Sequence, residues 1–177
     1  SRGLCDVYMR QLALQLGGAE PHRLAAAVRA VEPFSFDEIN LNVGCPSPRV
    51  QSGRFGACLM AEPELVADIV KVMRDQTDRP VTVKCRIGID DMDPETGLDR
   101  FVDAVADAGV QVIYLHARKA WLSGLSPKEN REIPPLDYGR AERLARRRPE
   151  LDIILNGGLT DRDMTTAILQ PLGQIFA

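Results

Sequence analysis

The chain has 177 residues, of which 45% are hydrophobic and 27% are charged, and its formal net charge is −3. This composition is typical of a soluble globular protein with one domain, and the length is short for two domains of ordinary size. No apolar run approaches the length that spans a bilayer, and the slightly acidic balance offers no general basic surface for nucleic acid. These values argue against an integral membrane protein and against a purely charge-driven nucleic-acid binder.

Strands and amphipathic helices alternate along the chain. Period-2 alternation or short apolar runs predict strands, and apolar residues at helical spacing predict helices. In the first half we expect a strand at 12–16, a helix at Pro21–Val31, a strand at 38–42, a long loop to Ala57 and a helix at 63–77. In the second half we expect a strand at Val81–Arg86, a helix ending near Ala108, a strand at Val112–His116, a helix at 138–148, a strand at Asp152–Asn156, a helix at 161–169 and the beginning of a strand at Ile175–Phe176.

Strict alternation of strand and helix implies a parallel sheet with right-handed crossovers, either doubly wound or closed as a (β/α)8 barrel. No GxGxxG follows the first strand, which weakens the doubly wound alternative. Each of the first five strands carries a polar residue at or near its carboxyl end, and barrels build their sites from many strand ends. We therefore expect an α/β fold, a partial TIM barrel of five to six βα units forming one domain over residues 1–177. The polar residues are Gln15, Asn42, Lys84, His116 and Asn156.

The cysteines and histidines predict neither disulfide bonds nor a metal site. No CxxC pair occurs, and His22 and His116 do not stand at zinc-like spacing from any thiol. We therefore expect reduced thiols in a cytoplasmic protein. The four cysteines are Cys5, Cys45, Cys58 and Cys85.

One thiol stands where a strand ends. The stretch EINLNVGCP at 38–46 alternates as a strand does, then Gly44 permits a tight turn and Pro46 prevents the strand from continuing. Cys45 is thereby placed at the carboxyl end of a strand, where α/β enzymes keep their reactive groups. The alternative interpretation is that Cys45 is a small buried hydrophobic residue.

Four segments resemble the tRNA-dihydrouridine synthases. Residues 38–60, EINLNVGCPSPRVQSGRFGACLM, look like the family signature, and VTVKCRIGID at 81–90 and ILNGG at 154–158 match further blocks in the same order. Residues 116–138 resemble the bacterial branch named tRNA-dihydrouridine(20/20a) synthase. Residues 1–10 fit the family pattern poorly. We expect a piece of a longer protein, with the family's first and last barrel strands and its C-terminal helical tRNA-binding domain outside this sequence.

The resemblance implies reduction of the uracil C5–C6 double bond in D-loop uridines 20/20a, with FMN as cofactor and NADPH as reductant. Reduced FMN gives a hydride to C6, and an acid on the other face must protonate C5. An unperturbed thiol, with a pKa of about 8.5, is mostly protonated at neutral pH and suits that role. The resemblance therefore assigns Cys45 as the proton donor, whereas we expect Cys58 and Cys85 to be structural.

The resemblance also implies a set of flavin contacts. Lys84 lies in an otherwise apolar strand, where an ammonium group needs a partner, and we expect it at the N1/O2 side of the ring, with a salt bridge as the alternative. Gln15 suits the polar edge of the isoalloxazine, and His116 matches a flavin-contacting histidine. Asn156, Gly157 and Gly158 lead toward a helix near 160–161, whose backbone N–H groups would bind the phosphate, although Asn-Gly-Gly alone equally indicates a turn.

For tRNA, the resemblance implicates three polar residues. Asn42 lies three residues before Cys45 and is expected to bond a flipped uracil. Lys128 and Arg131 match family positions that touch tRNA and set subfamily choice, and Trp121 is expected to stack a base or anchor its loop. The alternative interpretation of Lys128 and Arg131 is a pair of solvated loop charges.

Three other functions stay open at the level of sequence. Another FMN barrel with an Asn-x-x-Cys-Pro loop, such as a dihydroorotate or dihydropyrimidine dehydrogenase, would act on free pyrimidines. A truncated remnant would neither close nor hold FMN, and its open sheet edges would favour association. A tRNA-binding module without chemistry is the third, and the acidic charge balance gives it no electrostatic support.

Overall fold

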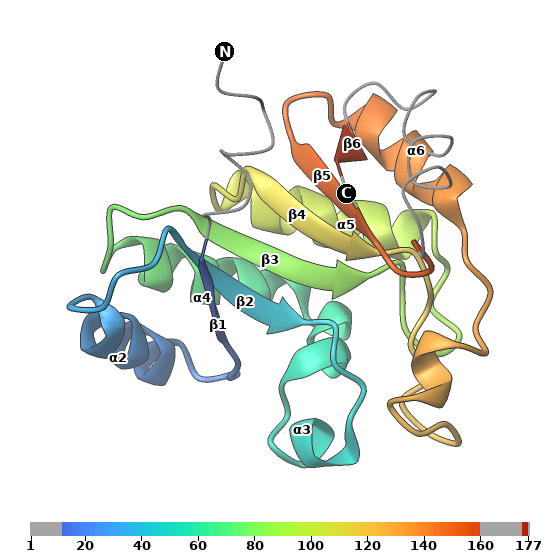
Figure 1. Ribbon diagram of the computed structural model, residues 1–177, viewed down its shortest axis with the longest axis horizontal. Helices are drawn as coiled ribbons and strands as arrows, with labels where there is room; N and C mark the ends of the chain where they lie inside the picture. The colour runs from blue at the N-terminus through green and yellow to red at the C-terminus, as the bar shows by residue number, and fades with distance from the viewer. Residues whose placement is uncertain (1–11, 160–174, 177) are drawn as a thin grey trace.

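A six-stranded parallel sheet organises the protein (Figure 1). The computed structural model describes residues 12–159 and 175–176. The strands pair in chain order, β1-β2-β3-β4-β5-β6, and every pairing is parallel. They are β1 (Ala13–Leu16), β2 (Glu38–Val43), β3 (Val81–Arg86), β4 (Val112–His116), β5 (Asp152–Asn156) and β6 (Ile175–Phe176).

The unbroken strand order distinguishes the two expected architectures. A doubly wound sheet reverses its order at a switch point, whereas a barrel adds each new strand beside the previous one. Here no reversal occurs from β1 to β6. The predicted α/β fold with a barrel-type parallel sheet is confirmed over the described residues.

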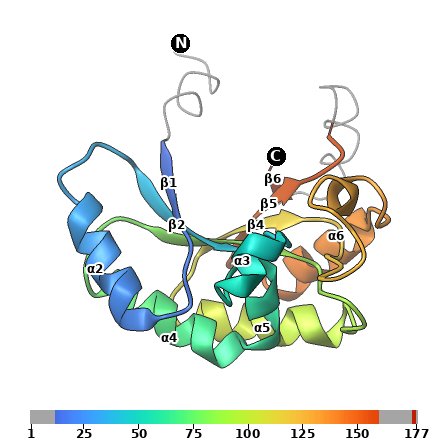
Figure 2. The same cartoon turned by 90° about the horizontal axis from the view of Figure 1, so that it is seen from below.

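Among the described residues, four longer helices connect the strands. They are α2 (Pro21–Val31), α4 (Pro63–Arg74), α5 (Thr96–Asp107) and α6 (Tyr138–Arg147). Figure 2 shows α2, α4 and α5 along one face of the sheet, with α6 at the end where β4 and β5 lie. The helix expected at 161–169 lies outside the described residues. Over the described ranges, no helix is both long and apolar enough to cross a bilayer.

The expectation of a plain loop between β2 and α4 was wrong. This connection holds a short α-helix, α3 (Pro48–Ser52), and a 3-10 helix, η1 (Gly56–Ala61). The loop between β4 and α6 likewise contains η2 (Glu129–Arg131). Helix α4 ends at Arg74 rather than at Thr77, and the Thr77 hydroxyl donates to the carboxylate of Glu32.

Successive side chains of each strand point to opposite faces of the sheet. On the helix side, residues such as Leu41, Val83 and Ile113 are fully buried and belong to one apolar core. Each such side chain contributes about 1.5 to 3 kcal/mol of transfer free energy on burial. Cys85 belongs to this set, and burial raises the pKa of its thiol to about 12, so it stays protonated in the core.

The opposite face of the sheet is polar. The strand register places Asn42 beside Lys84, Arg86 beside His116, and His116 beside Asn156. These residues lie at or near the carboxyl ends of their strands, so their side chains gather at the carboxyl edge of the sheet. This edge is where the sequence predicted the reactive site.

Candidate active site

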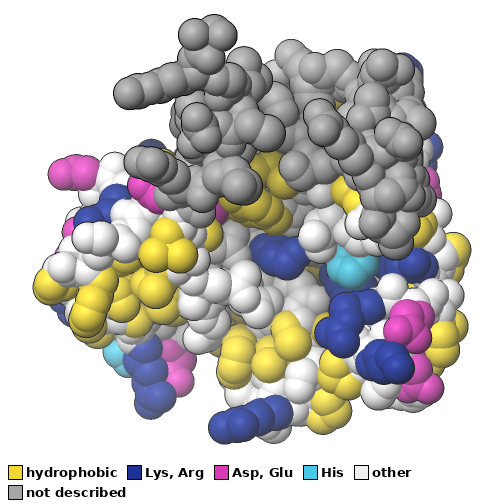
Figure 3. All heavy atoms as spheres, in the orientation of Figure 1, with side chains coloured by type: hydrophobic (Ala, Val, Ile, Leu, Met, Phe, Trp, Pro, Cys, Tyr) yellow, Lys and Arg dark blue, Asp and Glu magenta, His cyan; other side chains and the backbone are white. Residues whose placement is uncertain are grey.

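A cavity of about 230 Å³ opens at the carboxyl ends of the strands. Figure 3 shows Lys and Arg side chains gathered around a histidine on this face of the molecule. Most of the residues predicted for the site line the cavity. Gly157 and Gly158 come directly after the lining residue Asn156 in the sequence, and Lys128 lies in the neighbouring loop. The lining residues are Gln15, Asn42, Gly44, Cys45, Pro46, Lys84, Cys85, Arg86, His116, Pro127, Arg131 and Asn156.

The Asn42 amide holds the turn that carries Cys45. Its Oδ1 accepts hydrogen bonds from the backbone N–H groups of Gly44 and Cys45, both at 3.1 Å. Its Nδ2 donates to the Oε1 of Gln15 at 3.2 Å, and the Nε2 of Gln15 donates to Asn40 at 2.7 Å. The side-chain oxygen thus mimics a backbone turn, and the cysteine backbone leaves the strand in one defined direction.

The carbonyl groups of the same turn are also bonded. The Gly44 oxygen accepts from the Nε of Arg86 at 3.2 Å, and the Cys45 oxygen accepts from the Ala57 N–H at 2.9 Å. Gly56 has φ of +75°, and a Cβ there would lie 2.6 Å from the Cys45 oxygen, so only glycine permits this approach. The thiol therefore projects from a backbone that is fixed before any ligand binds.

Lys84 lies on the polar face of β3 beside the cavity. Its Nζ donates to the Oδ1 of Asn156 at 2.9 Å. Burial lowers the pKa of this ammonium group, and the nearby charge of Arg86 lowers it further. The expected alternative, a salt bridge, does not occur among the described residues, because the partner is a neutral amide.

His116 is neutral in this environment. The side chain is only 8% exposed, and burial, followed by the charges of Arg86 and Lys84, lowers its pKa to about 3. Its Nε2 is buried and has no hydrogen-bond partner among the described residues. An orphaned polar atom at a cavity wall is costly unless a ligand bonds it, so His116 is suited to contact a bound molecule.

The buried neutral His116 predicts a pH-dependent stability. Between pH 6.5 and pH 5 the unfolded chain binds a proton at this residue that the folded state rejects, so the free energy of unfolding falls as the pH falls. We expect His116→Asn to flatten this slope, measured by urea denaturation at pH 6.5 and pH 5. Equal slopes in the wild type and the variant would contradict the assignment.

Gly157 packs against the His116 ring, and Gly158 packs against Leu136 and Tyr138. Gly157 has φ of +95°, and a Cβ there would lie 2.5 Å from the His116 ring. Gly158 has φ of +73°, and a Cβ there would lie 2.7 Å from the Tyr138 hydroxyl, which itself donates to the Gly157 oxygen at 2.8 Å. Both positions need glycine for backbone conformation and for space. The helix expected to follow them lies outside the described residues.

Sequence reasoning missed Arg86. Besides its bond to Gly44, its Nη1 donates to the backbone oxygen of Asn130 at 2.9 Å. Burial is the main cause that lowers the pKa of this guanidinium to about 10. The available signal was its position two residues after Lys84, on the same face of β3.

The long loop between β4 and α6 places two cations beside the site. Arg131 lines the cavity, and Lys128 is exposed directly before η2. Trp121 in the same loop is 38% exposed, and the Nζ of Lys119 lies 5.8 Å from the centre of its ring. This loop therefore offers cations and a partly exposed indole to a partner approaching the cavity.

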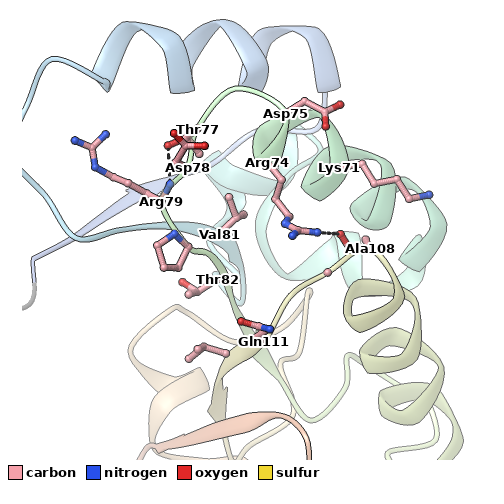
Figure 4. A pocket seen from close by; sticks show the side chains of 13 residues that line it. Lys71, Arg74, Asp75, Thr77, Asp78, Arg79, Val81, Thr82, Ala108 and Gln111 are labelled. Atoms are coloured by element: carbon pink, nitrogen blue, oxygen red, sulfur yellow. Dashed lines mark hydrogen bonds between the residues drawn. The ribbon is translucent and has the colours of Figure 1, made fainter.

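A larger cavity of about 590 Å³ lies at the other end of the sheet (Figure 4). The Lys and Arg side chains that line this larger cavity already bond other groups of the protein. The Nη1 of Arg74 donates to the Ala108 oxygen at 2.9 Å, Arg79 pairs with Glu32 at 2.5 Å, and Lys71 lies 3.4 Å from Asp68. Barrel enzymes place their chemistry at the carboxyl ends of strands, so the smaller cavity is the candidate active site. Within the described ranges, no group of three His, Cys, Asp or Glu residues could hold a metal ion.

Comparisons with known proteins identify the family of this chain. The model of the dihydrouridine synthase family matches residues 5–175. Curated tRNA-dihydrouridine(20/20a) synthases from Shewanella oneidensis, Xanthomonas campestris and Escherichia coli are 57%, 54% and 56% identical over 93% of this chain. The chain covers 49%, 49% and 50% of these proteins, so it spans about half the length of the curated relatives it matches. The chain belongs to the dihydrouridine synthase family.

Proposed function

We propose that the protein carrying this chain reduces D-loop uridines 20/20a of tRNA to 5,6-dihydrouridine in the cytoplasm. Family membership and the names of the relatives support the reaction and the substrate. The observation that carries the proposal is the fixed Cys45 turn in one cavity with Lys84 and His116. A reactive thiol opposite polar flavin-binding groups is the arrangement that this reduction needs.

We infer that FMN is the cofactor at this cavity. The buried Nε2 of His116 lacks a partner among the described residues, and Lys84 and Gln15 bring donors to the same space. Lys84 and His116 would contact the polar edge of the flavin ring, and Gln15 and Asn156 would flank it. Gly157 and Gly158 would bring the backbone to its phosphate. When bound and reduced by NADPH, FMN supplies the hydride for C6 of the uracil.

The chain's own residues supply the proton and the positions of the reactants. The Cys45 thiol donates its proton to C5, so the double bond gains a hydride and a proton, and the thiolate recovers a proton from solvent. Asn42 fixes the direction of this thiol and lies at the cavity wall, where the uracil edge would approach. Arg131 and Lys128 would hold the phosphates of the tRNA, since the base must leave its stack to reach Cys45.

The test is reduction of an unmodified tRNA transcript by the purified whole protein with FMN and NADPH. We expect dihydrouridine at positions 20/20a, detected by mass spectrometry of the digested tRNA. Free uracil and orotate serve as competing substrates. Turnover of a free pyrimidine without turnover of tRNA would replace the proposal by the pyrimidine dehydrogenase alternative, and a protein that never retains flavin would contradict it outright.

Lys84→Met tests the flavin contact separately. A hydrogen bond from a charged group contributes about 1.5 to 3 kcal/mol, so we expect FMN to bind roughly 10- to 100-fold more weakly. The measurement is the flavin absorbance retained after desalting and a titration of the apoprotein. Lys71→Met, on α4 at the opposite end of the sheet, is the matched control and is expected to retain the flavin. Unchanged affinity in Lys84→Met would remove this residue from the flavin site.

A further inference from the structure

The side chain of Gln51 bridges two loops that are distant in sequence. Its Nε2 donates to the Pro46 oxygen at 2.8 Å and to the Leu122 oxygen at 2.7 Å. Pro46 is the residue directly after Cys45, and Leu122 belongs to the loop between β4 and α6. Gln51 is half-buried in α3 and does not line the catalytic cavity. Any effect it has on the reaction must therefore pass through the residues it holds.

A second bridge runs on the other side of Cys45. Arg86 donates both to the Gly44 oxygen and to the Asn130 oxygen, so it connects the cysteine turn to the same β4–α6 loop. Each of the two residues that flank Cys45 thus accepts a hydrogen bond at its carbonyl oxygen. The two donor side chains, Arg86 and Gln51, also bond the loop that carries Lys128 and Arg131.

Further hydrogen bonds hold the β4–α6 loop at Asn130 and Leu122, the two residues that Arg86 and Gln51 contact. The fully buried Asn130 accepts from the Trp121 N–H at 2.7 Å and donates to the Trp121 oxygen at 3.0 Å. The Leu122 N–H donates to the Oδ1 of Asp90 at 2.8 Å. A displacement of this loop therefore reaches the cysteine turn as a shift of the Pro46 and Gly44 carbonyls.

We propose that Gln51 is a positioning residue that couples the tRNA-facing β4–α6 loop to the Cys45 thiol. The inference rests on the proposed function, since it names a further residue of that reaction. Contact of tRNA with the loop would set the position of Leu122, and Gln51 would carry that position to the backbone beside Cys45. Misplacement of a reacting group by about 1 Å can lower a rate by about 100-fold, so one lost bridge has a measurable effect.

Two variants of the whole protein test this coupling. Gln51→Glu is isosteric but places a carboxylate against two carbonyl oxygens, and Gln51→Met removes both bonds at similar volume. Gln111→Glu makes the same chemical change at the opposite end of the sheet and serves as the matched control. The first measurement separates kcat from KM for tRNA, with bound flavin quantified. The second measures alkylation of Cys45 by iodoacetamide, with Cys58 as internal reference.

We expect both Gln51 variants to lose about 10- to 100-fold in kcat at saturating tRNA and to retain flavin. The control variant Gln111→Glu is expected to keep wild-type activity. Cys45 should react with iodoacetamide at a changed rate, while Cys58, which donates to the Phe55 oxygen at 3.2 Å, keeps its own rate. Wild-type turnover and wild-type Cys45 reactivity in Gln51→Met would overturn the coupling. If the wild type fails to reduce tRNA, the proposed function fails, and the alkylation rates still decide whether Gln51 positions Cys45.

Discussion

Cys45→Ala is expected to lower dihydrouridine formation by roughly 100- to 10,000-fold, the range that positioned proton donors contribute. The turn around Cys45 is held by Asn42 and Ala57 through backbone groups, so loss of the thiol leaves its geometry intact. Flavin retention should therefore match the wild type. The measurement is single-turnover reduction of a tRNA transcript by the reduced protein, monitored by the return of oxidised-flavin absorbance.

Cys58→Ala is the control for this prediction. Cys58 is a second half-buried thiol, and its Sγ donates to the Phe55 backbone oxygen rather than facing the cavity. We expect near wild-type turnover from this variant. Full activity in Cys45→Ala would show that the proton for C5 comes from another group, and loss of flavin in that variant would reassign Cys45 to cofactor binding.

Arg140→Ala is expected to destabilise the protein by about 3 to 5 kcal/mol, because it removes one partner of a buried ionic network. Arg140 is 1% exposed on α6. Its Nε donates to the Pro94 oxygen at 2.7 Å, its Nη2 donates to the Glu95 oxygen at 3.1 Å, and it also pairs with the Asp99 carboxylate. Alanine would leave the Pro94 oxygen without its side-chain donor and open a cavity between α5 and α6, while the Glu95 oxygen keeps the Asp99 N–H and the Asp99 carboxylate keeps Arg147.

Arg143→Ala provides the comparison on the same helix. Arg143 is 52% exposed and pairs with the Glu95 carboxylate at 2.5 Å, a carboxylate that also lies 3.5 Å from the buried Arg140. Exposed pairs contribute little because water screens them, and we expect a much smaller loss than in Arg140→Ala. Urea denaturation of both variants measures the difference. Equal losses would show that burial does not set the strength of the Arg140 network.

The strands could be predicted closely because their sequence pattern is local. β3, β4 and β5 have the predicted bounds, β1 begins one residue later and β2 ends one residue later. Apolar residues that face the helices alternate with polar residues on the other face, and this period identifies a strand without tertiary information. Helix α2 was found for the same reason, from apolar residues at helical spacing.

The short helices could not be predicted in this way. α3, η1 and η2 contain between three and six residues, too few for a periodic pattern to emerge. Their stability comes from contacts across loops, such as the bonds of Gln51 to Pro46 and Leu122. Sequence alone does not show which loops will meet.

The site was predictable where it depends on strand ends. Parallel strands bring Asn42, Lys84, His116 and Asn156 to one edge, and these residues do line a common cavity. Their roles toward flavin and tRNA stay predictions. Arg86 and Gln51 were missed because their side chains bond carbonyl oxygens of other segments. The local sequence does not show such bonds, although it does place Arg86 on the same face of β3 as Lys84.

The alternation of buried and cavity-facing residues along the strands also has a consequence for how the sequence can evolve. Leu41 and Asn42, or Val83 and Lys84, are neighbours in sequence, yet one packs under the helices and the other faces the cavity. A substitution at a cavity position therefore alters reactivity while leaving the packed interior unchanged. An evolving lineage can explore new substrates on this scaffold one residue at a time without first losing the ability to fold.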